Sequence, residues 1–205
     1  MQPKRKRSPG RPHAEPIAAP MREQILQSAA QLFMRFGYEG VSIQAVADDC
    51  GVTKATVYYY FPTKSDLFTS TIVRMLGNVK TRILSILELP EPLQARLIRI
   101  AEQYLNVPHF DMDIMLAKAA EAMTPEQTQA MREAEAAIYR VVVDAFDAAA
   151  RAGEIRGVDP AVAGHAYIAV MRIGNTRYAE EKPLFASTSA AARAIVELIW
   201  QGVGR

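Results

Sequence analysis

Apolar residues recur at helical spacing along almost the whole chain from Met21 onward, and no alternating run typical of a strand competes with them. We therefore predict an all-α protein of about nine helices. The first helix should end at Gly37, and two short helices should follow Ser42 and Thr53. A long fourth helix should start after Thr63 and run almost to Pro90. Five later helices are predicted near residues 93–106, 111–122, 125–152, 160–180 and 188–202.

The first 20 residues differ in character from the rest. They contain five prolines and almost no large apolar side chains, so they cannot bury enough surface to offset the entropy of ordering. We predict a disordered, basic arm at 1–20, with Pro20 as its boundary. Residues 21–67 should then form a small N-terminal domain of three helices, and residues 68–205 a larger helical domain.

The most informative stretch is residues 42–64, which reads SIQAVADDCGVTKATVYYYFPTK. Two short helices are joined by a tight turn at Gly51, a residue that tolerates a left-handed backbone. This arrangement predicts a helix-turn-helix, whose second helix enters the major groove of DNA. Val57 and Phe61 lie four residues apart and should face inward, which leaves the polar and tyrosine side chains free to face outward.

The order of residues from Met21 to Leu67 resembles the TetR family of regulators. The late segment 152–156, before Asp159 and Pro160, is also similar to a loop of that family. Two departures are Ala55, where many members carry glycine, and Tyr60, where histidine is common. The resemblance is carried by Ala29, Leu32, Phe33, Gly37, Tyr38, Val41, Ser42, Val46, Ala47, Gly51, Val52, Thr53, Thr56, Val57, Tyr58, Tyr60, Phe61, Lys64 and Leu67.

This resemblance implies roles for individual residues in DNA binding. Ser42 and Thr53 should cap helices and can bond phosphates, and Tyr58, Tyr60 and Lys64 resemble phosphate-contacting positions. Four further positions can face base edges: Lys54, Ala55, Thr56 and Tyr59. By geometry, a lysine suits guanine O6 and N7, and an alanine or threonine methyl suits the methyl group of thymine.

The N-terminal arm concentrates the positive charge of the chain. Residues 1–20 hold five basic residues against one acidic residue, whereas residues 21–74 hold five of each and the remainder is slightly acidic. Such an arm indicates a polyanionic partner. The sequence around Arg11, Pro-Gly-Arg-Pro, resembles an AT-hook that enters the minor groove. A solvated basic tail is an equally open interpretation.

Several classes of function find little support. The single cysteine, Cys50, allows no intrachain disulfide, and no apolar run approaches the ~20 residues that a membrane span needs, so we expect a cytoplasmic protein. His109, Asp111 and Asp113 lie close together, but their spacing does not converge on one helix face, and we predict no metal site. No cofactor motif, activated nucleophile or acid–base pair is evident, so we expect no catalytic residues and no enzyme.

The TetR resemblance implies that the larger domain encloses a pocket for a small-molecule effector. Methionine and aromatic side chains would suit an adaptable apolar cavity, although residues at this spacing are more often plain core. His165, Arg172 and Asn175 are the stronger polar candidates, facing either a ligand or a dimer partner. The remaining candidate lining residues are Tyr104, Phe110, Met112, Met115, Met123, Tyr139, Phe146, Tyr167 and Met171.

The last two predicted helices are strongly apolar, which favours a homodimer built on a symmetric four-helix contact. Two reading helices would then meet successive major grooves, and the operator should be palindromic. We expect a repressor that a largely apolar effector releases from DNA. The alternatives are an architectural DNA-binding protein that ignores small molecules, and a module whose tyrosine face binds a partner helix.

Overall fold

The computed structural model describes residues 15–107, 112–175 and 183–203, and within them the protein is all-helical. The order of elements confirms the predicted fold class. The helices are α1 (Glu15–Gly40), α2 (Ile43–Cys50), α3 (Lys54–Tyr60), α4 (Lys64–Leu87), α5 (Leu93–Asn106), α6 (Met112–Ala119), α7 (Pro125–Ala152), α8 (Pro160–Met171) and α9 (Thr188–Val203), with short 3-10 turns η1 (Ala120–Ala122) and η2 (Arg172–Asn175).

Helix α1 corrects the predicted boundary at Pro20. The helix begins at Glu15 and continues through Pro20, so the last six residues of the supposedly disordered arm are helical. Proline removes only one intrahelical bond here, close to an end where the first amides have no helical acceptor. The predicted stop at Gly37 is confirmed, since its φ of 70° and ψ of 176° interrupt the helix.

The first three helices and the start of α4 enclose one apolar cluster, which we call the head cluster. Ile25, Leu26 and Phe33 of α1 are at most 1% exposed, and Leu67 and Phe68 of α4 are fully buried. The cluster also takes in Met115 and Ala119 of α6 and Met131 of α7. We call α1–α3 with the start of α4 the head, and the rest of the molecule the body. The head is therefore joined to the body by side chains of α6 and α7 that pack in the head cluster, as well as by the continuous helix α4.

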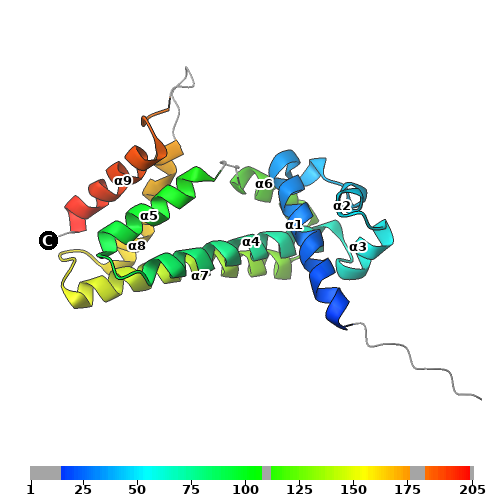
Figure 1. Cartoon of the computed structure of the whole chain (residues 1–205), viewed down its shortest axis with the longest axis horizontal. Helices are drawn as coiled ribbons and strands as arrows, with labels where there is room; N and C mark the ends of the chain where they lie inside the picture. Colours follow the sequence, from blue (N-terminus) through cyan, green and yellow to red (C-terminus); the bar gives the residue numbers. More distant parts are fainter. Residues whose placement is uncertain (1–14, 108–111, 176–182, 204–205) are drawn as a thin grey trace, which may run out of the picture.

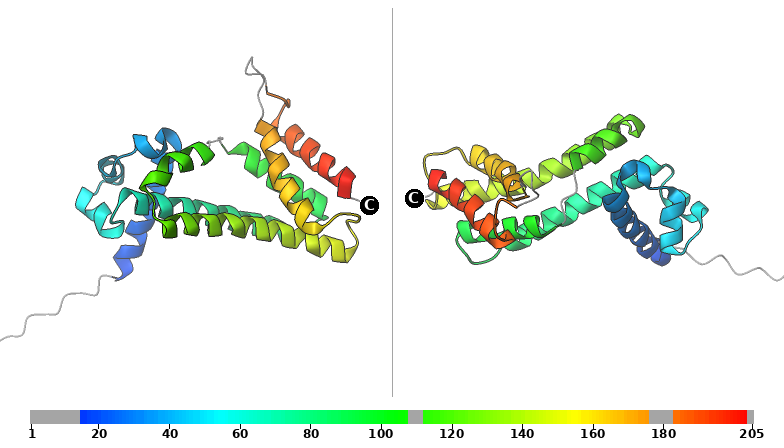
Figure 2. Two further views of the ribbon diagram at one scale, coloured as in Figure 1. Left: turned by 180° about the vertical axis from the view of Figure 1, so that it is seen from behind. Right: turned by 90° about the horizontal axis from the view of Figure 1, so that it is seen from above.

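Two long helices connect the head to the rest of the molecule. Helices α4 and α7 run side by side, with the head at one end and α5, α8 and α9 at the other (Figures 1 and 2). Between Ile72 and Ile83 no residue of α4 is fully buried, and the same holds for α7 between Met131 and Val142. The middle of this helix pair thus lacks a closed core.

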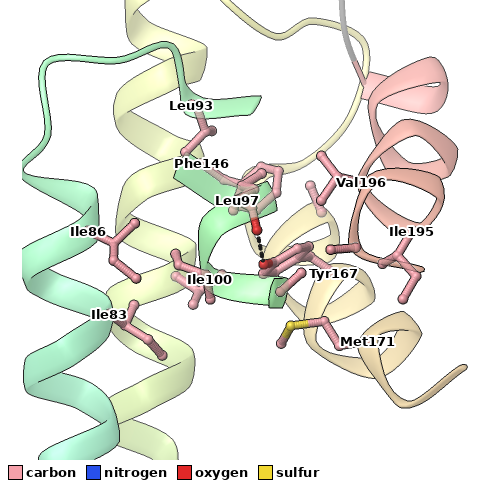
Figure 3. Close-up of a cluster of buried hydrophobic side chains, with 14 of the residues drawn as sticks. Ile83, Ile86, Leu93, Leu97, Ile100, Phe146, Tyr167, Met171, Ile195 and Val196 are labelled. Atoms are coloured by element: carbon pink, nitrogen blue, oxygen red, sulfur yellow. Dashed lines mark hydrogen bonds between the residues drawn. The ribbon is translucent and has the colours of Figure 1, made fainter. Parts of the chain in front are cut away.

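The second apolar cluster, which we call the body cluster, fills the far end of the molecule. Tyr167 of α8 lies at its centre, fully buried, and its hydroxyl donates a hydrogen bond to the Leu97 carbonyl oxygen at 2.7 Å (Figure 3). Phe146 of α7 and Leu93 of α5 are also fully buried beside it. Burial raises the pKa of Tyr167 far above its usual range, so this phenol stays neutral.

Helix α8 is shorter than predicted. It ends at Met171 instead of continuing to residue 180, and η2 follows. The turn brings the Gly174 backbone so close to Leu105 and Ile195 that an added Cβ would lie 2.5 Å from Leu105 Cδ2. The backbone of η2 thus packs directly against side chains of α5 and α9. Within the described parts of the chain, no helix has the length and apolar character needed to cross a membrane.

Candidate nucleic-acid interface

The turn between α2 and α3 has the geometry that the sequence predicted. Gly51 adopts a φ of 66°, in the left-handed region where glycine avoids a Cβ penalty. Its amide donates to the Asp48 carbonyl oxygen at 3.1 Å, and the Val52 amide donates to Ala47 at 2.9 Å. These bonds close α2 and redirect the chain within three residues.

Both short helices begin with a side-chain cap. The Ser42 hydroxyl accepts a hydrogen bond from the Ala45 amide at 3.0 Å, and the Thr53 hydroxyl accepts one from the Thr56 amide at 3.1 Å. Each cap satisfies a donor that the helix leaves unpaired. The predicted capping roles of Ser42 and Thr53 are therefore confirmed, while their contacts with phosphate stay a prediction.

Helix α3 buries one edge and presents the other to solvent. Val57 is fully buried and Phe61 is 2% exposed, so these two side chains anchor α3 in the head cluster. On the outer side Tyr59 is 81% exposed and Tyr58 42%, and Lys54 and Ala55 are also exposed. Thr56 and Tyr60 are half-buried, and the ring of Tyr60 meets that of Tyr59 edge to face. The described surface of α3 thus offers a short tyrosine-rich ridge.

Lys64, at the start of α4, is held beside the head rather than left free in solvent. Its Nζ lies 4.4 Å from the centre of the Tyr38 ring and 3.5 Å from the Glu39 carbonyl oxygen. Burial lowers the pKa of the ammonium, and the Glu39 carboxylate raises it in part. Tyr38 is itself 7% exposed and packs edge to face on Phe68, so its ring holds a fixed position beneath the Lys64 ammonium.

Polar contacts hold α1 against α2 and against the end of α3. The Ser28 hydroxyl donates to the Asp49 carboxylate at 2.5 Å, and the Gln24 amide donates to the Cys50 carbonyl oxygen at 3.2 Å. The Arg22 guanidinium lies 5.1 Å from the centre of the Phe61 ring. The sequence analysis missed these contacts and the support from Tyr38, because each joins residues far apart in the chain. Arg11 lies outside the described residues.

The structure separates the predicted effector-lining residues into different places. Phe146, Tyr167 and Met171 fill the packed body cluster. Met115 lies in the head cluster, and Met123 packs against it. These five residues do not surround one cavity, because the two clusters lie at opposite ends of the α4–α7 pair.

Three more of the predicted lining residues lie outside both clusters. Tyr104 and Arg172 are exposed and Asn175 is half-buried. Phe110 lies outside the described residues, as do His109, Asp111 and the side chains of Met112 and Asp113. Among the side chains that are described, no group of three metal-binding types gathers at one point.

Two of the candidates do meet. The rings of Tyr139 on α7 and His165 on α8 stack with their centres 4.8 Å apart. They line an open hollow of about 480 Å³ on the outside of these helices, together with charged residues of both signs, among them Arg132 and Asp144.

Comparison with known proteins is consistent with this geometry. Residues 25–71 match the sequence profile of the family described as bacterial regulatory proteins, tetR family. The uncharacterised HTH-type transcriptional regulator YuxN of Bacillus subtilis is 37% identical over 62 residues, which are 30% of this chain and 21% of that protein. The aligned part spans between about a fifth and two fifths of the lengths of the first curated relatives.

Solved structures share the fold over nearly the whole chain. A protein described as a TetR-family transcriptional regulator, from Mesorhizobium loti, superposes with a TM-score of 0.73 at 21% identity, covering 92% of this chain and 98% of that one. AibR, in complex with isovaleryl coenzyme A and operator DNA, superposes with a TM-score of 0.64 at 22% identity, covering 87% and 97%. At these identities the likeness establishes the fold alone.

Proposed function

We propose that the chain is a regulator of the TetR family, whose sequence profile residues 25–71 match, and that it is a homodimeric repressor of transcription. In this proposal the repressor leaves a palindromic operator when a small, largely apolar effector binds in the larger domain. The observation that carries the proposal is the exposed ridge of α3. Lys54, Tyr58 and Tyr59 face solvent over a buried Val57, as a helix that reads the major groove requires.

Contacts to bases and to phosphates are divided along the head. Lys54 would donate to guanine, Ala55 and Thr56 would contact thymine methyl groups, and Tyr59 would reach a neighbouring base edge. Tyr58, Tyr60 and Lys64, together with the caps at Ser42 and Thr53, would bind the phosphates that flank the groove. Residues 21–74 hold five acidic and five basic residues, so Arg11 and the rest of the basic arm would supply the long-range attraction.

Dimer formation through α8 and α9 is supported by the apolar side chains that these helices leave uncovered. Val162 of α8 and Leu198 of α9 are each 60% exposed, and Ile173 in η2, directly after α8, is 41% exposed. Ala169 of α8 and Ala194 of α9 are small and exposed between them, which permits a close approach of helices. A symmetric contact here would hold two α3 helices at a spacing of roughly 34 Å or a multiple of the helical repeat.

An effector would act near the middle of the α4–α7 pair, where the two helices have no fully buried residue. The middle of the α4–α7 pair has no closed core, and the Tyr139–His165 stack lies on the α8 side of α7. AibR binds an acyl thioester in the same fold, so acyl-coenzyme A thioesters are the first class to test. The effector shifts the population of dimers only by its difference in affinity between the two arrangements.

The proposal is tested by selecting duplexes from a random pool with the full-length protein and measuring affinity against salt. We expect a palindromic consensus, and a variant with Lys54→Ala and Tyr59→Ala should lose the sequence preference while keeping its fold. Titrating acyl-coenzyme A thioesters into the complex should then release the DNA. Enrichment of no sequence would overturn the proposal, whereas sequence-specific binding with no response to any bound ligand would favour the architectural alternative.

A further inference from the structure

The N-termini of two helices from different parts of the chain meet where the head joins the body. Helix α4 begins with a capping box, in which the Asp66 amide donates to Thr63 Oγ1 at 3.0 Å and the Thr63 amide donates to Asp66 Oδ2 at 3.1 Å. Helix α7 begins in the same way. The Gln127 amide donates to Thr124 Oγ1 at 3.2 Å, and the Thr124 amide donates to Gln127 Oε1 at 3.0 Å.

One side chain ties these two boxes together. Gln127 Nε2 donates to Asp66 Oδ1 at 2.7 Å and lies 3.4 Å from the Ser65 hydroxyl, across 61 residues of sequence in the first case. The oxygen of the Gln127 amide closes its own helix, and the nitrogen reaches the other helix. A glutamate at this position would cap α7 equally well but would have no hydrogen to donate. The contact to Asp66 is therefore a separate feature from the cap.

The charges around this joint favour a firm contact. The Asp66 carboxylate lies in the first turn of α4, where the partial positive charge of the helix end stabilises an anion, and it accepts a bond from the first turn of α7 as well. Ser65 beside it is 8% exposed. A bond to a carboxylate in partly buried surroundings is stronger than one between neutral groups in water.

The apolar part of the joint follows one turn later. Met131 of α7 is 7% exposed and packs in the head cluster, after which α7 has no fully buried residue until Val142. The contact of α7 with the head is thus confined to its first two turns. A shift of α7 against α4 in the open middle section would reach the head through these turns, beside the contacts of Met115 and Ala119 of α6.

We propose that Gln127 is a positioning residue, whose bond to Asp66 sets the orientation of the DNA-reading head relative to the body. Its role in operator binding rests on the proposed function above, whereas its role in orientation does not. With the bond intact the head is held in one orientation. With the bond broken the head samples several, and the fraction that fits the operator falls.

The chain supplies variants that separate this role from capping. Gln127→Glu keeps the cap of α7 but places a carboxylate opposite Asp66. Asp66→Asn weakens the same contact from the other side. The double variant exchanges donor and acceptor, because an asparagine at 66 can donate to a glutamate at 127. The matched control is Gln129→Glu, which loses a similar amide–carboxylate bond, from Gln129 Nε2 to Glu133 at 2.8 Å, within α7 alone.

Orientation is measured directly by electron–electron double resonance between spin labels. The labels are placed at the exposed positions Gln31 on α1 and Arg151 on α7 in a Cys50→Ala background, and an excess of unlabelled chain removes distances between subunits. We expect a narrow distance distribution for the parent and for Gln129→Glu. Gln127→Glu and Asp66→Asn should broaden it, and the double variant should restore the narrow form.

Operator affinity supplies the second measurement. Loss of a hydrogen bond to a charged group predicts a roughly tenfold weaker affinity for Gln127→Glu, and near-parent affinity for the double variant. If Gln127→Glu gives the same distance distribution as Gln129→Glu, or if the double variant stays broad, the joint does not set the orientation. If the parent binds no selected duplex, the proposed function fails, but the distances still decide the inference.

Discussion

The close contact between α7 and α8 makes a sharp prediction about stability. Gly164 of α8 lies so near α7 that an added Cβ would be 2.9 Å from Val143 Cγ2 and 3.1 Å from Val143 Cα. The backbone atom cannot rotate away, so Gly164→Ala must push the two helices apart. Gly77, inside α4, is the matched control, because a Cβ there would meet no atom within 4 Å.

The magnitude follows from two opposing effects. Alanine is favoured over glycine in a helix interior by about 1 kcal/mol, and both variants gain this. Overpacking a fitted contact costs about 1–3 kcal/mol, and only Gly164→Ala incurs it. We therefore expect Gly77→Ala to raise the free energy of unfolding by about 1 kcal/mol. Gly164→Ala should leave that free energy unchanged or lower it by up to about 2 kcal/mol.

Urea unfolding followed by circular dichroism measures the difference, at equal chain concentrations because dimerisation would add to stability. Thermal unfolding should agree, since 1 kcal/mol corresponds to roughly 2–4 °C for a chain of this size. A Gly164→Ala protein as stable as Gly77→Ala would refute the reasoning, since it would mean that the helices separate at no cost.

Three further predictions concern the core, the DNA and the dimer. Tyr167→Phe removes the buried hydroxyl and should cost about 1 kcal/mol in urea unfolding. Burial raises the pKa of Tyr167 in the folded protein, so at high pH this phenol ionises in the unfolded chain but stays neutral in the folded one. The free energy of unfolding of the parent should therefore fall as the pH rises above about 10, and that of the phenylalanine variant should fall less. Lys64→Gln should weaken binding to all duplexes alike and reduce the salt slope by about one per head, whereas Lys54→Ala should alter the preferred sequence, both measured by fluorescence anisotropy. Leu198→Glu should convert the proposed dimer to a monomer in sedimentation velocity, whereas Val79→Glu, at an exposed site on α4, should not.

The helices and the head could be predicted because their causes are local. The turn at Gly51 follows from one residue's backbone freedom, and the caps at Ser42 and Thr53 follow from hydroxyls just before helical runs. The inward edge of α3 follows from the four-residue spacing of Val57 and Phe61.

The features that were missed depend on contacts between distant parts of the chain. Nothing near Met115 in the sequence indicates that it packs in the head while Phe146 packs in the body. The capping box at Thr124 and Gln127 is visible as a pattern, but the second bond of Gln127, to Asp66, is not. The helical segment 15–20 was also missed, because five prolines in the first 20 residues indicated disorder, whereas Pro20 lies near the start of α1, where it removes only one intrahelical bond.

The separation of the apolar interior into a head cluster and a body cluster has an evolutionary consequence. A substitution in one cluster alters the packing of that cluster first, because the two clusters have no buried side chain in common. In the proposed repressor, the effector site could therefore change while the head kept its preference for one operator sequence.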